Sequence, residues 1–209
     1  MKNKKDITFI DLFAGAGGLS EGFVQAGYTP IAHVEADSAA CMTLKTRSCY
    51  YYLKNSGKYD IYRNYLQGKI PRNELYRYLP EEEHSRIINK TIGPENNSDI
   101  FASIDRGLEG KQVDLIIGGP PCQAYSIVGR SRSADGMKSD LRNYLYLEYM
   151  KYLNHFRPRM FVFENVLGLQ SAQNGKYLED MKIKFRESGY EIQVFRLNAR
   201  NFGVLQNRI

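Results

Sequence analysis

One cysteine in the sequence has neighbours that favour chemistry over packing. Cys122 directly follows the Gly-Gly-Pro-Pro run at residues 118–121, which ends an apolar, strand-like segment. The two prolines fix φ and remove two backbone donors, so the turn keeps its shape without sheet pairing. A thiol on such a turn can act as a nucleophile where nearby donors or cations lower its pKa. Cys41, in a helix-like run, better suits a buried packing role, and nothing distinguishes Cys49.

A carboxylate stands at a second strand end. Glu164 follows the apolar run Met-Phe-Val-Phe at residues 160–163 and precedes Asn165. A carboxyl group at the rim of a dry pocket suits proton donation to a substrate nitrogen. A helix N-terminal acid or a structural ion pair is the alternative, and for Glu164 alone that alternative is favoured. With Cys122 at a neighbouring strand end, the catalytic interpretation becomes the better one.

Two further strand ends carry residues typical of a nucleotide-like ligand. Residues 11–19 (Asp-Leu-Phe-Ala-Gly-Ala-Gly-Gly-Leu) hold three glycines in four positions, which lets the backbone approach a ligand closely. Glu35 ends the next expected strand, where an acidic side chain can accept hydrogen bonds from ribose hydroxyls. A Gly-rich turn alone can be merely a tight turn. Together, the two features predict an adenosine-containing cofactor.

These residues need a scaffold that gathers strand ends. Apolar runs predict strands at residues 7–10, 30–34, 113–117, 159–163 and 190–197. Helices are expected at residues 19–26, 38–46 and 177–187, and around an apolar stripe formed by Leu141, Leu145, Tyr149, Tyr152 and Phe156. Strands alternating with helices predict an α/β fold, a mostly parallel sheet with helices on both faces. Ligands of such sheets bind at the carboxyl ends of the strands.

Residues 47–97 interrupt this alternation of strands and helices. The segment holds eight of the sixteen tyrosines and nine Lys or Arg against six Asp or Glu. Helical pieces are expected at residues 60–67, 72–79 and 80–89. One interpretation is a DNA-facing flap, because aromatic side chains interleaved with cations suit stacking and phosphate contact. The other, which is favoured, is a small helical subdomain that packs its tyrosines on the core.

The bulk properties are those of a single soluble domain. The chain has 209 residues, of which 43% are hydrophobic and 25% charged. No run approaches the ~18 apolar residues of a membrane span, and no signal peptide is recognised, so a cytoplasmic protein is expected. Three cysteines and three histidines without a CxxC pair predict no metal site. The net charge of +6 is compatible with a polyanionic partner, and equally with simple solubility.

The motifs DLFAGAGGLSEGF, GGPPCQAYS, FENV and FGVLQNR occur in this order, and with them the chain resembles the bacterial C5-cytosine-specific DNA methyltransferase family. The resemblance covers nearly the whole chain outside residues 47–97. It implies a Rossmann-like fold that binds S-adenosylmethionine. The residues implied at the cofactor are Phe13, Ala14, Gly15, Gly17, Gly18, Leu19, Glu35 (on the ribose), Asp99 and Ile100 (along the adenine), Pro120 and Leu145. Those implied at the target base are Cys122 as nucleophile, Glu164, Asn165, Gln123 in the catalytic loop and Arg208.

The implied reaction is methylation of carbon 5 of cytosine in double-stranded DNA through a covalent Cys122 adduct, within a restriction-modification system. The base must leave the stack for this chemistry. Residues 128–138, which are basic, small and polar, would form a loop that closes on DNA. No membrane and no metal is implied.

The chain departs from the family pattern at its end. It stops at residues 206–209, within a motif, and Leu205 stands where the family has proline. The target-recognition region and a closing motif that returns to the cofactor are not present, so residues 1–209 are expected to be an incomplete catalytic domain, possessing no sequence specificity of its own. Two explanations compete: one subunit of a split enzyme whose partner supplies recognition, or a truncated chain, inactive alone. The abrupt end favours truncation.

Two other functions compete with DNA methylation. A tRNA-acting C5-cytosine methyltransferase would share the same catalytic residues, although the Pro-Cys-Gln form at residues 121–123 looks more like the DNA enzymes. A non-catalytic fragment that binds only cofactor or DNA is the third possibility. Methyl transfer to tRNA against duplex DNA separates the first two, and cofactor binding without turnover would indicate the third.

Overall fold

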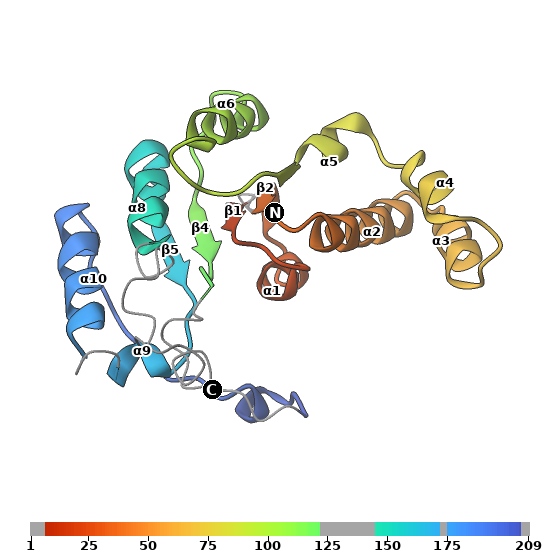
Figure 1. Ribbon diagram of the computed structural model, residues 1–209. Coiled ribbons are helices and arrows are strands. Elements are labelled where there is room, and N and C mark those ends of the chain that lie inside the picture. The colour runs from red at the N-terminus through yellow and green to blue at the C-terminus, as the bar shows by residue number, and fades with distance from the viewer. Residues whose placement is uncertain (1–6, 122–144, 172–174, 206–209) are drawn as a thin grey trace, which may run out of the picture. The chain divides into compact units, whose positions relative to one another are not determined.

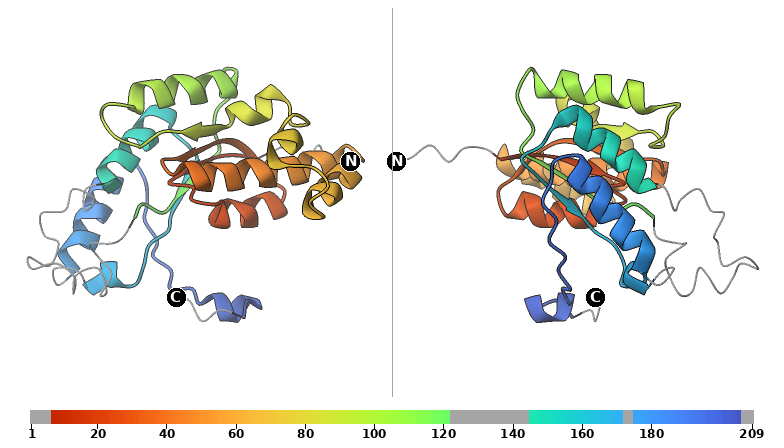
Figure 2. Two further views of the ribbon diagram at one scale, coloured as in Figure 1. Left: turned by 45° about the vertical axis from the view of Figure 1, so that its right-hand side comes forward. Right: turned by 90° about the vertical axis from the view of Figure 1, so that its left-hand side faces the viewer.

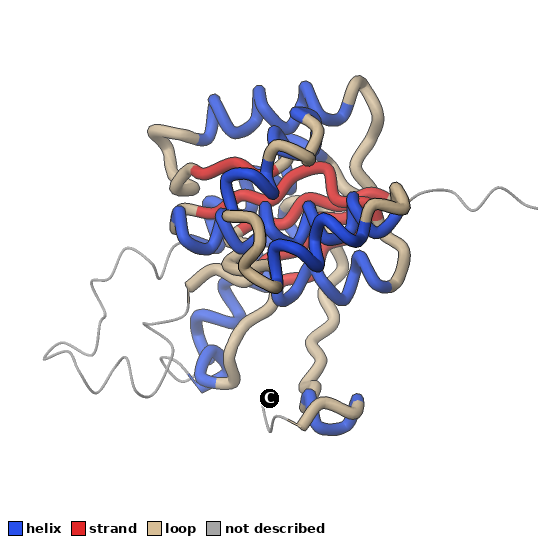
Figure 3. The backbone as a smooth tube through the Cα atoms, turned by 90° about the vertical axis from the view of Figure 1, so that its right-hand side faces the viewer, coloured by secondary structure: helices blue, strands red, loops and turns tan. Residues whose placement is uncertain are grey.

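The computed structural model describes residues 7–121, 145–171 and 175–205. Its centre is a five-stranded sheet in the order β3-β2-β1-β4-β5. Figure 1 labels these strands, and the tube view shows them stacked side by side (Figure 3). The strands are β1 (Thr8–Leu12), β2 (Thr29–Glu35), β3 (Ile87–Asn89), β4 (Leu115–Gly118) and β5 (Met160–Phe163). β1 pairs in parallel with β2 and β4, and β2 pairs in parallel with β3. The predicted α/β architecture is thereby confirmed.

Helices connect the strands. Their bounds are α1 (Gly18–Gln25), α2 (Ser38–Asn55), α3 (Tyr59–Leu66), α4 (Arg72–Tyr76), α5 (Glu81–Ser85), α6 (Asn97–Leu108), α8 (Leu145–Phe156), α9 (Gly168–Ser171), α10 (Lys176–Glu187) and the 3-10 helix η3 (Ala199–Phe202). The chain forms two compact units, one made of residues 1–118 and 156–162 and the other of residues 119–155 and 163–209. The first contains nearly all of the sheet. The second contains the segments that follow β4 and β5.

The sheet buries apolar side chains on both faces, which is why its strands read as continuous apolar runs. On one face Phe9, Leu115 and Ile117 are buried and pack against α1 residues such as Phe23. On the other side α6 packs on β2, and its Ile104 is buried. Figures 1 and 2 show α1 and α6 on opposite sides of β1 and β2. Burying each such side chain stabilises the fold by roughly 1.5–3 kcal/mol.

Residues 47–97 begin inside a helix, because α2 continues past the expected end at residue 46 as far as Asn55. Together with α3 and α4, the far end of α2 encloses a small core of its own: Cys49, Leu53, Leu75 and Leu79, each at most 5% exposed. Tyr52, Tyr62, Tyr65 and Tyr76 pack against this core. The part of the segment up to Leu79 therefore forms a helical lobe in which four tyrosines pack on a local core and not on that of the sheet, and the later part of the segment returns to the sheet as a strand.

Two sequence-based expectations about secondary structure are wrong. The helix expected at residues 80–89 ends at Ser85, and Ile87–Asn89 instead form β3, which extends the sheet beyond β2. Residues 190–197 form no strand, since no strand in the described part of the chain pairs with them. Phe195 and Leu197 there are 70% and 60% exposed. A strand needs a neighbouring edge to satisfy its backbone, and an apolar run alone does not supply one.

The packing role expected for Cys41 is confirmed, and so is the helix expected around Leu145 to Phe156. Cys41 lies in α2 and is 4% exposed, in keeping with a packing role. α8 carries the part of the predicted apolar stripe that begins at Leu145, whereas Leu141 lies outside the described residues. Among the described residues, none of the helices combines the length and apolar composition that a membrane span requires. The same residues contain no group of three His, Cys, Asp or Glu side chains arranged to hold a metal ion.

Candidate functional site

The Gly-rich turn after β1 has a backbone shape that depends on positive φ angles. Phe13, Gly15 and Gly17 have φ of 56°, 54° and 84°. The turn is tied to β2 by the Ala14 N–H, which donates to the Val34 carbonyl at 3.1 Å. A Cβ added at Gly17 would lie 2.8 Å from Cδ2 of Leu44, whereas one at Gly15 or Gly18 would meet nothing within 4 Å. Position 17 thus serves packing, and positions 15 and 18 leave open space for a ligand.

Glu35, at the end of β2, joins two backbone segments. Its carboxylate accepts a hydrogen bond from the Gly15 N–H at 2.7 Å and another from the Asp37 N–H at 2.8 Å. Each bond uses one of the two oxygens, and a carboxylate offers about four acceptor positions, so capacity remains for hydroxyl groups of a ligand. The side chain is half-buried. Sequence reasoning found Glu35 and the glycines separately, and the structure brings them together.

Asn89 is a residue of this region that sequence reasoning missed. Its amide Nδ2 donates to the carbonyls of Glu35 and Ala36 at 3.0 and 2.9 Å, and so closes the turn after β2. Its position at the end of β3 became visible only once residues 87–89 proved to be a strand. The next residue, Lys90, pairs with Asp99 at 2.5 Å. The hydrogen bond from Lys90 and its positive charge lower the pKa of Asp99.

The other residues predicted at the cofactor have mixed placements. Ile100 is fully buried in α6, and Ala14 is buried in a cluster with Cys41 and Leu44. Leu19 packs against the apolar cluster under α1. These side chains support the site from inside the fold. The predicted alignment of Asp99 and Ile100 along an adenine ring stays a prediction.

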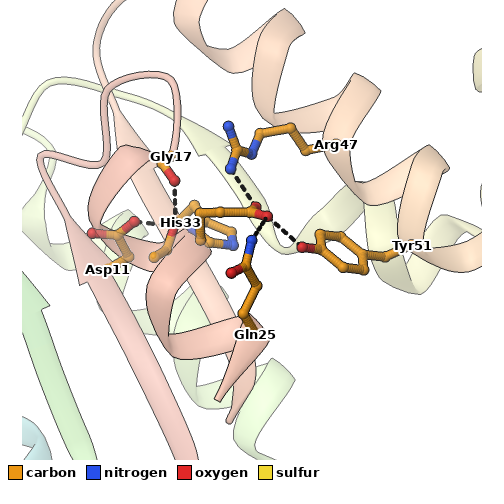
Figure 4. Close-up of polar contacts among 8 residues, drawn as sticks. Asp11, Gly17, Gln25, His33, Arg47 and Tyr51 are labelled. Carbon is orange, nitrogen blue, oxygen red and sulfur yellow. Dashed lines mark hydrogen bonds and ion pairs between the residues drawn. The ribbon is translucent and has the colours of Figure 1, made fainter. Parts of the chain in front are cut away.

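A hydrogen-bond network that the sequence did not reveal ties α1 to α2 (Figure 4). The Glu21 carboxylate accepts from the Tyr51 hydroxyl at 2.5 Å, from the Gln25 amide at 2.8 Å and from the Arg47 guanidinium. Burial raises the pKa of Glu21, but the three hydrogen bonds and the charge of Arg47 outweigh it, and the pKa is lowered overall. The network fixes α2 over the helix that the Gly-rich turn begins.

A second polar pair lies beneath the turn. The Asp11 carboxylate is 3.2 Å from Nδ1 of His33, and both residues are buried in neighbouring positions of β1 and β2. In the same region, the Ser20 hydroxyl donates to the carbonyl of Gly17 at 3.3 Å (Figure 4). Buried polar groups of this kind cost free energy unless paired, so their pairing specifies one arrangement of the strand ends.

The ends of β4 and β5 lead into the second compact unit, where the predicted residue Glu164 lies against Gly119. A Cβ added at Gly119 would lie 2.7 Å from the Glu164 carboxylate and 3.3 Å from the Glu164 carbonyl oxygen. Glu164 therefore lies directly against the backbone of the Gly-Gly-Pro-Pro turn. The side chain of Asn165 accepts a hydrogen bond from the Val166 N–H at 2.9 Å. Pro120 is buried, Pro121 is exposed.

Several predicted site residues cannot be placed. Cys122, Gln123 and Arg208 lie outside the described residues, and so do residues 128–138. Leu145 is the first residue of α8 and is half-buried. The predicted meeting of Cys122 with Glu164 consequently stays a prediction, whereas the contact of Glu164 with the turn before Cys122 is observed.

The fold and the two strand-end sites define a class of protein. A parallel sheet with a Gly-rich turn after its first strand and an acid after its second is the arrangement of α/β domains that bind nucleotide-like ligands. The family model for C-5 cytosine-specific DNA methylase matches residues 7–74 and 82–209. The chain belongs to this family. The predicted resemblance is confirmed.

Individual proteins give the same result. The chain is 39% identical over 227 residues to the type II methyltransferase M.Bpa9945I of Bacillus paralicheniformis, a match that covers 95% of this chain and 51% of that protein. It is 33% identical to the type II methyltransferase M.AgeI of Thalassovita gelatinovora, with coverage of 95% and 37%. The chain thus spans about half or less of the length of these relatives.

A solved structure supports the fold. A crystal structure described as a prophage-encoded DNA modification methyltransferase from E. coli aligns with 87% of this chain and 38% of its own, with a TM-score of 0.52 and 22% identity. At this identity the likeness concerns the fold. It agrees with the Rossmann-like, mostly parallel sheet that the sequence predicted.

Proposed function

We propose that this chain carries the cofactor-binding and target-base part of an enzyme that transfers a methyl group from S-adenosylmethionine to carbon 5 of cytosine in double-stranded DNA. Family membership supports the reaction class. Two relatives named type II methyltransferases support a role in a restriction-modification system. The observation that carries the proposal is the contact between Glu164 and Gly119, three residues before Cys122.

The residues after β1 and β2 fit S-adenosylmethionine. The open space beside Gly15 and Gly18 admits a ligand against the backbone, and Glu35 retains acceptor capacity for two ribose hydroxyls. The hydrogen bond between Gly15 and Glu35 holds both groups in position before any ligand arrives, which reduces the entropic cost of binding. When bound, S-adenosylmethionine supplies an electrophilic methyl group, and its sulfonium leaves as a neutral thioether.

The target-base residues supply the activation that cytosine lacks. The Cys122 thiolate forms a bond to carbon 6 of the flipped base, while Glu164 donates a hydrogen bond or proton to N3, so the ring electron pair moves to carbon 5. After carbon 5 has been methylated, a base takes its proton. The electron pair of that C–H bond then expels the Cys122 thiolate and restores the aromatic ring. Cys122 follows Gly119 by three residues, a stretch that spans at most about 10 Å, and the proposal requires its thiol to reach the base that Glu164 contacts.

The test is methyl transfer from radiolabelled S-adenosylmethionine to duplex DNA, with the 209-residue chain alone and together with a polypeptide that supplies target recognition. Cys122→Ala is expected to abolish transfer, and Cys49→Ala, which removes a buried thiol from a cluster separate from the cofactor residues, is the matched control. DNA containing 5-fluorocytosine should trap a covalent adduct with the parent and not with Cys122→Ala. Transfer by Cys122→Ala at the parental rate would refute the mechanism.

A further inference from the structure

The positive charge of this chain is concentrated in one segment. Residues 45–79 contain eight Lys or Arg and two Asp or Glu, a net charge of +6. The whole chain, with 29 basic and 23 acidic residues, also has a net charge of +6. The remaining 174 residues therefore balance at 21 of each sign. We call residues 45–79 the basic lobe.

The basic lobe is a folded structure. It consists of the far part of α2 with α3 and α4, which contact one another around Cys49, Leu53 and Leu75. Figures 1 and 2 show α3 and α4 at the end of α2 that lies away from β1 and β2. α2 starts beside the Glu35 turn, where Asp37 caps its first turn by accepting from the Ala40 N–H at 2.8 Å. One continuous helix thus connects the cofactor turn with the lobe.

Most of the positive charges of the basic lobe are not neutralised by nearby acidic side chains that the structure describes. Six of them are exposed: Lys54, Lys58, Arg63, Lys69, Arg72 and Arg77. Arg63 pairs with Asp60. In contrast, Lys58, Lys69 and Arg77 form no ion pair with any residue that the structure describes. The acidic run that follows lies in α5, outside the lobe, and Glu82 and Glu83 there pair with Arg86.

Tyrosine rings lie under two of these cations, Lys54 and Arg63. The Tyr50 ring makes edge contacts with Tyr59 and Tyr62, at centroid distances of 6.1 and 5.3 Å. Lys54 extends over Tyr50 with Nζ 5.4 Å from the ring centroid and 3.2 Å from its hydroxyl. Burial raises the pKa of Tyr62, so this phenol stays neutral and adds no negative charge. Neutral tyrosine hydroxyls can donate to phosphate oxygens.

The tyrosine contacts also indicate the kind of polyanion. Tyr50 contacts Tyr59 and Tyr62 edge-to-face, and Lys54 and Arg63 lie over the Tyr50 and Tyr59 rings, so these ring faces are occupied and less suited to the base stacking that single-stranded nucleic acids use. Exposed lysines and arginines on a folded helical surface suit a regular array of phosphates, the backbone of a duplex. We propose that the basic lobe binds the phosphates of double-stranded DNA, as a contact surface separate from the target-base site. The inference rests on the proposed function for DNA as the substrate.

The test compares two triple variants that lose the same charge. Lys58→Gln with Lys69→Gln and Arg77→Gln removes three exposed lobe cations. Lys111→Gln with Lys151→Gln and Lys184→Gln removes three cations elsewhere that pair with local acids. Binding of a fluorescein-labelled DNA duplex is followed by anisotropy over a series of KCl concentrations. A parallel series uses single-stranded RNA of the same length.

The lobe variant is expected to bind duplex DNA about tenfold or more weakly at ~100 mM salt, and the slope of log K against log salt should shrink by about 0.9 for each lost contact. The control variant should match the parent. Equal binding by all three proteins, equal weakening in both variants, no DNA binding by the parent, or a loss confined to RNA would each overturn the proposal.

Methyl transfer separates this inference from the proposed function. At saturating DNA and low salt, the lobe variant should transfer methyl groups at the parental kcat, with a raised KM for DNA. A lobe variant that binds DNA like the parent would refute the proposed DNA contact of the basic lobe. Methyl transfer that depends on Cys122 would still support the proposed function. Absence of transfer in every protein would count against the proposed function, and the anisotropy series would still decide about the lobe.

Discussion

The two strand-end acids of this protein are held in different ways. Glu35, after β2, is fixed by attraction, because both of its carboxylate oxygens accept backbone N–H groups from Gly15 and Asp37. Glu164, after β5, lies against Gly119, where an added Cβ would come within 2.7 Å of its carboxylate, so its present position requires glycine there. The backbone N–H groups that bind Glu35 persist when neighbouring side chains change, whereas the space beside Glu164 exists only while position 119 is glycine.

The largest effect is expected from Glu164→Gln. An amide cannot supply a proton to N3 of the base, so kcat for methyl transfer should fall by about 10²- to 10⁴-fold. Calorimetry should give an unchanged Kd for S-adenosylmethionine, because the acid proposed to bind the ribose is Glu35 and Glu164 is assigned to the target base. A parallel loss of cofactor affinity would mean that the two acids serve one site.

Gly119→Ala should reduce kcat by about 10- to 100-fold while leaving the protein folded. The added methyl group displaces the Glu164 side chain, and misplacement of a catalytic group by about 1 Å can cost roughly 10²-fold. Gly22→Ala is the matched control, because a Cβ at this α1 position meets nothing within 4 Å. Adding Gly119→Ala to Glu164→Gln should cause little further loss, and full additivity would disprove the steric explanation.

Glu35→Gln tests the other side of the comparison. The amide loses the charge that strengthens hydrogen bonds to Gly15, Asp37 and the ribose hydroxyls, so Kd for S-adenosylmethionine should rise by about tenfold. At saturating cofactor, kcat should stay within about twofold of the parent. Isothermal titration and steady-state kinetics measure the two quantities. A kcat defect that excess cofactor does not correct would contradict a pure binding role.

The smallest effect is expected from Glu21→Gln, which weakens the link between α1 and α2. The free energy of unfolding should fall by about 1 kcal/mol at pH 7, measured by urea denaturation. The folded state lowers the pKa of Glu21 below its ordinary value of 4.5, so its contribution is complete above that value and is lost as the pH falls through the folded pKa. The stability difference between parent and variant should therefore shrink below about pH 4.5, and a constant difference would exclude an ionic role.

Much of the sheet could be read from the sequence, because buried parallel strands are short apolar runs bounded by turn residues. β1, β2, β4 and β5 lie close to their expected positions. β3 was missed since its three residues follow a helix and carry no alternation of their own. The strand expected at residues 190–197 failed for the opposite reason: its composition is strand-like, but pairing is a property of a neighbour.

For the candidate site as well, features encoded in the local sequence were predicted, and features that depend on distant residues were not. Glycines, acids and the Pro-Pro turn are recognisable by residue type, so the sequence singled out Gly15, Glu35 and Glu164 as candidates. Asn89 and the Glu21 network were not found, because a side chain that bonds across 26 to 54 residues leaves no local pattern. The reason for Gly119 was hidden as well, since only the fold brings Glu164 against it.

Position 17 illustrates how strongly such a turn restricts the substitutions that a sequence can accept during evolution. A side chain at Gly17 meets two independent obstacles: Leu44 from α2 occupies the space, and a φ of 84° is unfavourable to L-residues by about 1–2 kcal/mol. Shrinking Leu44 first removes the collision but not the backbone penalty, and it opens a cavity in a cluster that also holds Ala14. Replacing Gly17 in a single step therefore lowers the stability of the fold. Replacing it after a smaller residue has been introduced at Leu44 lowers the stability as well.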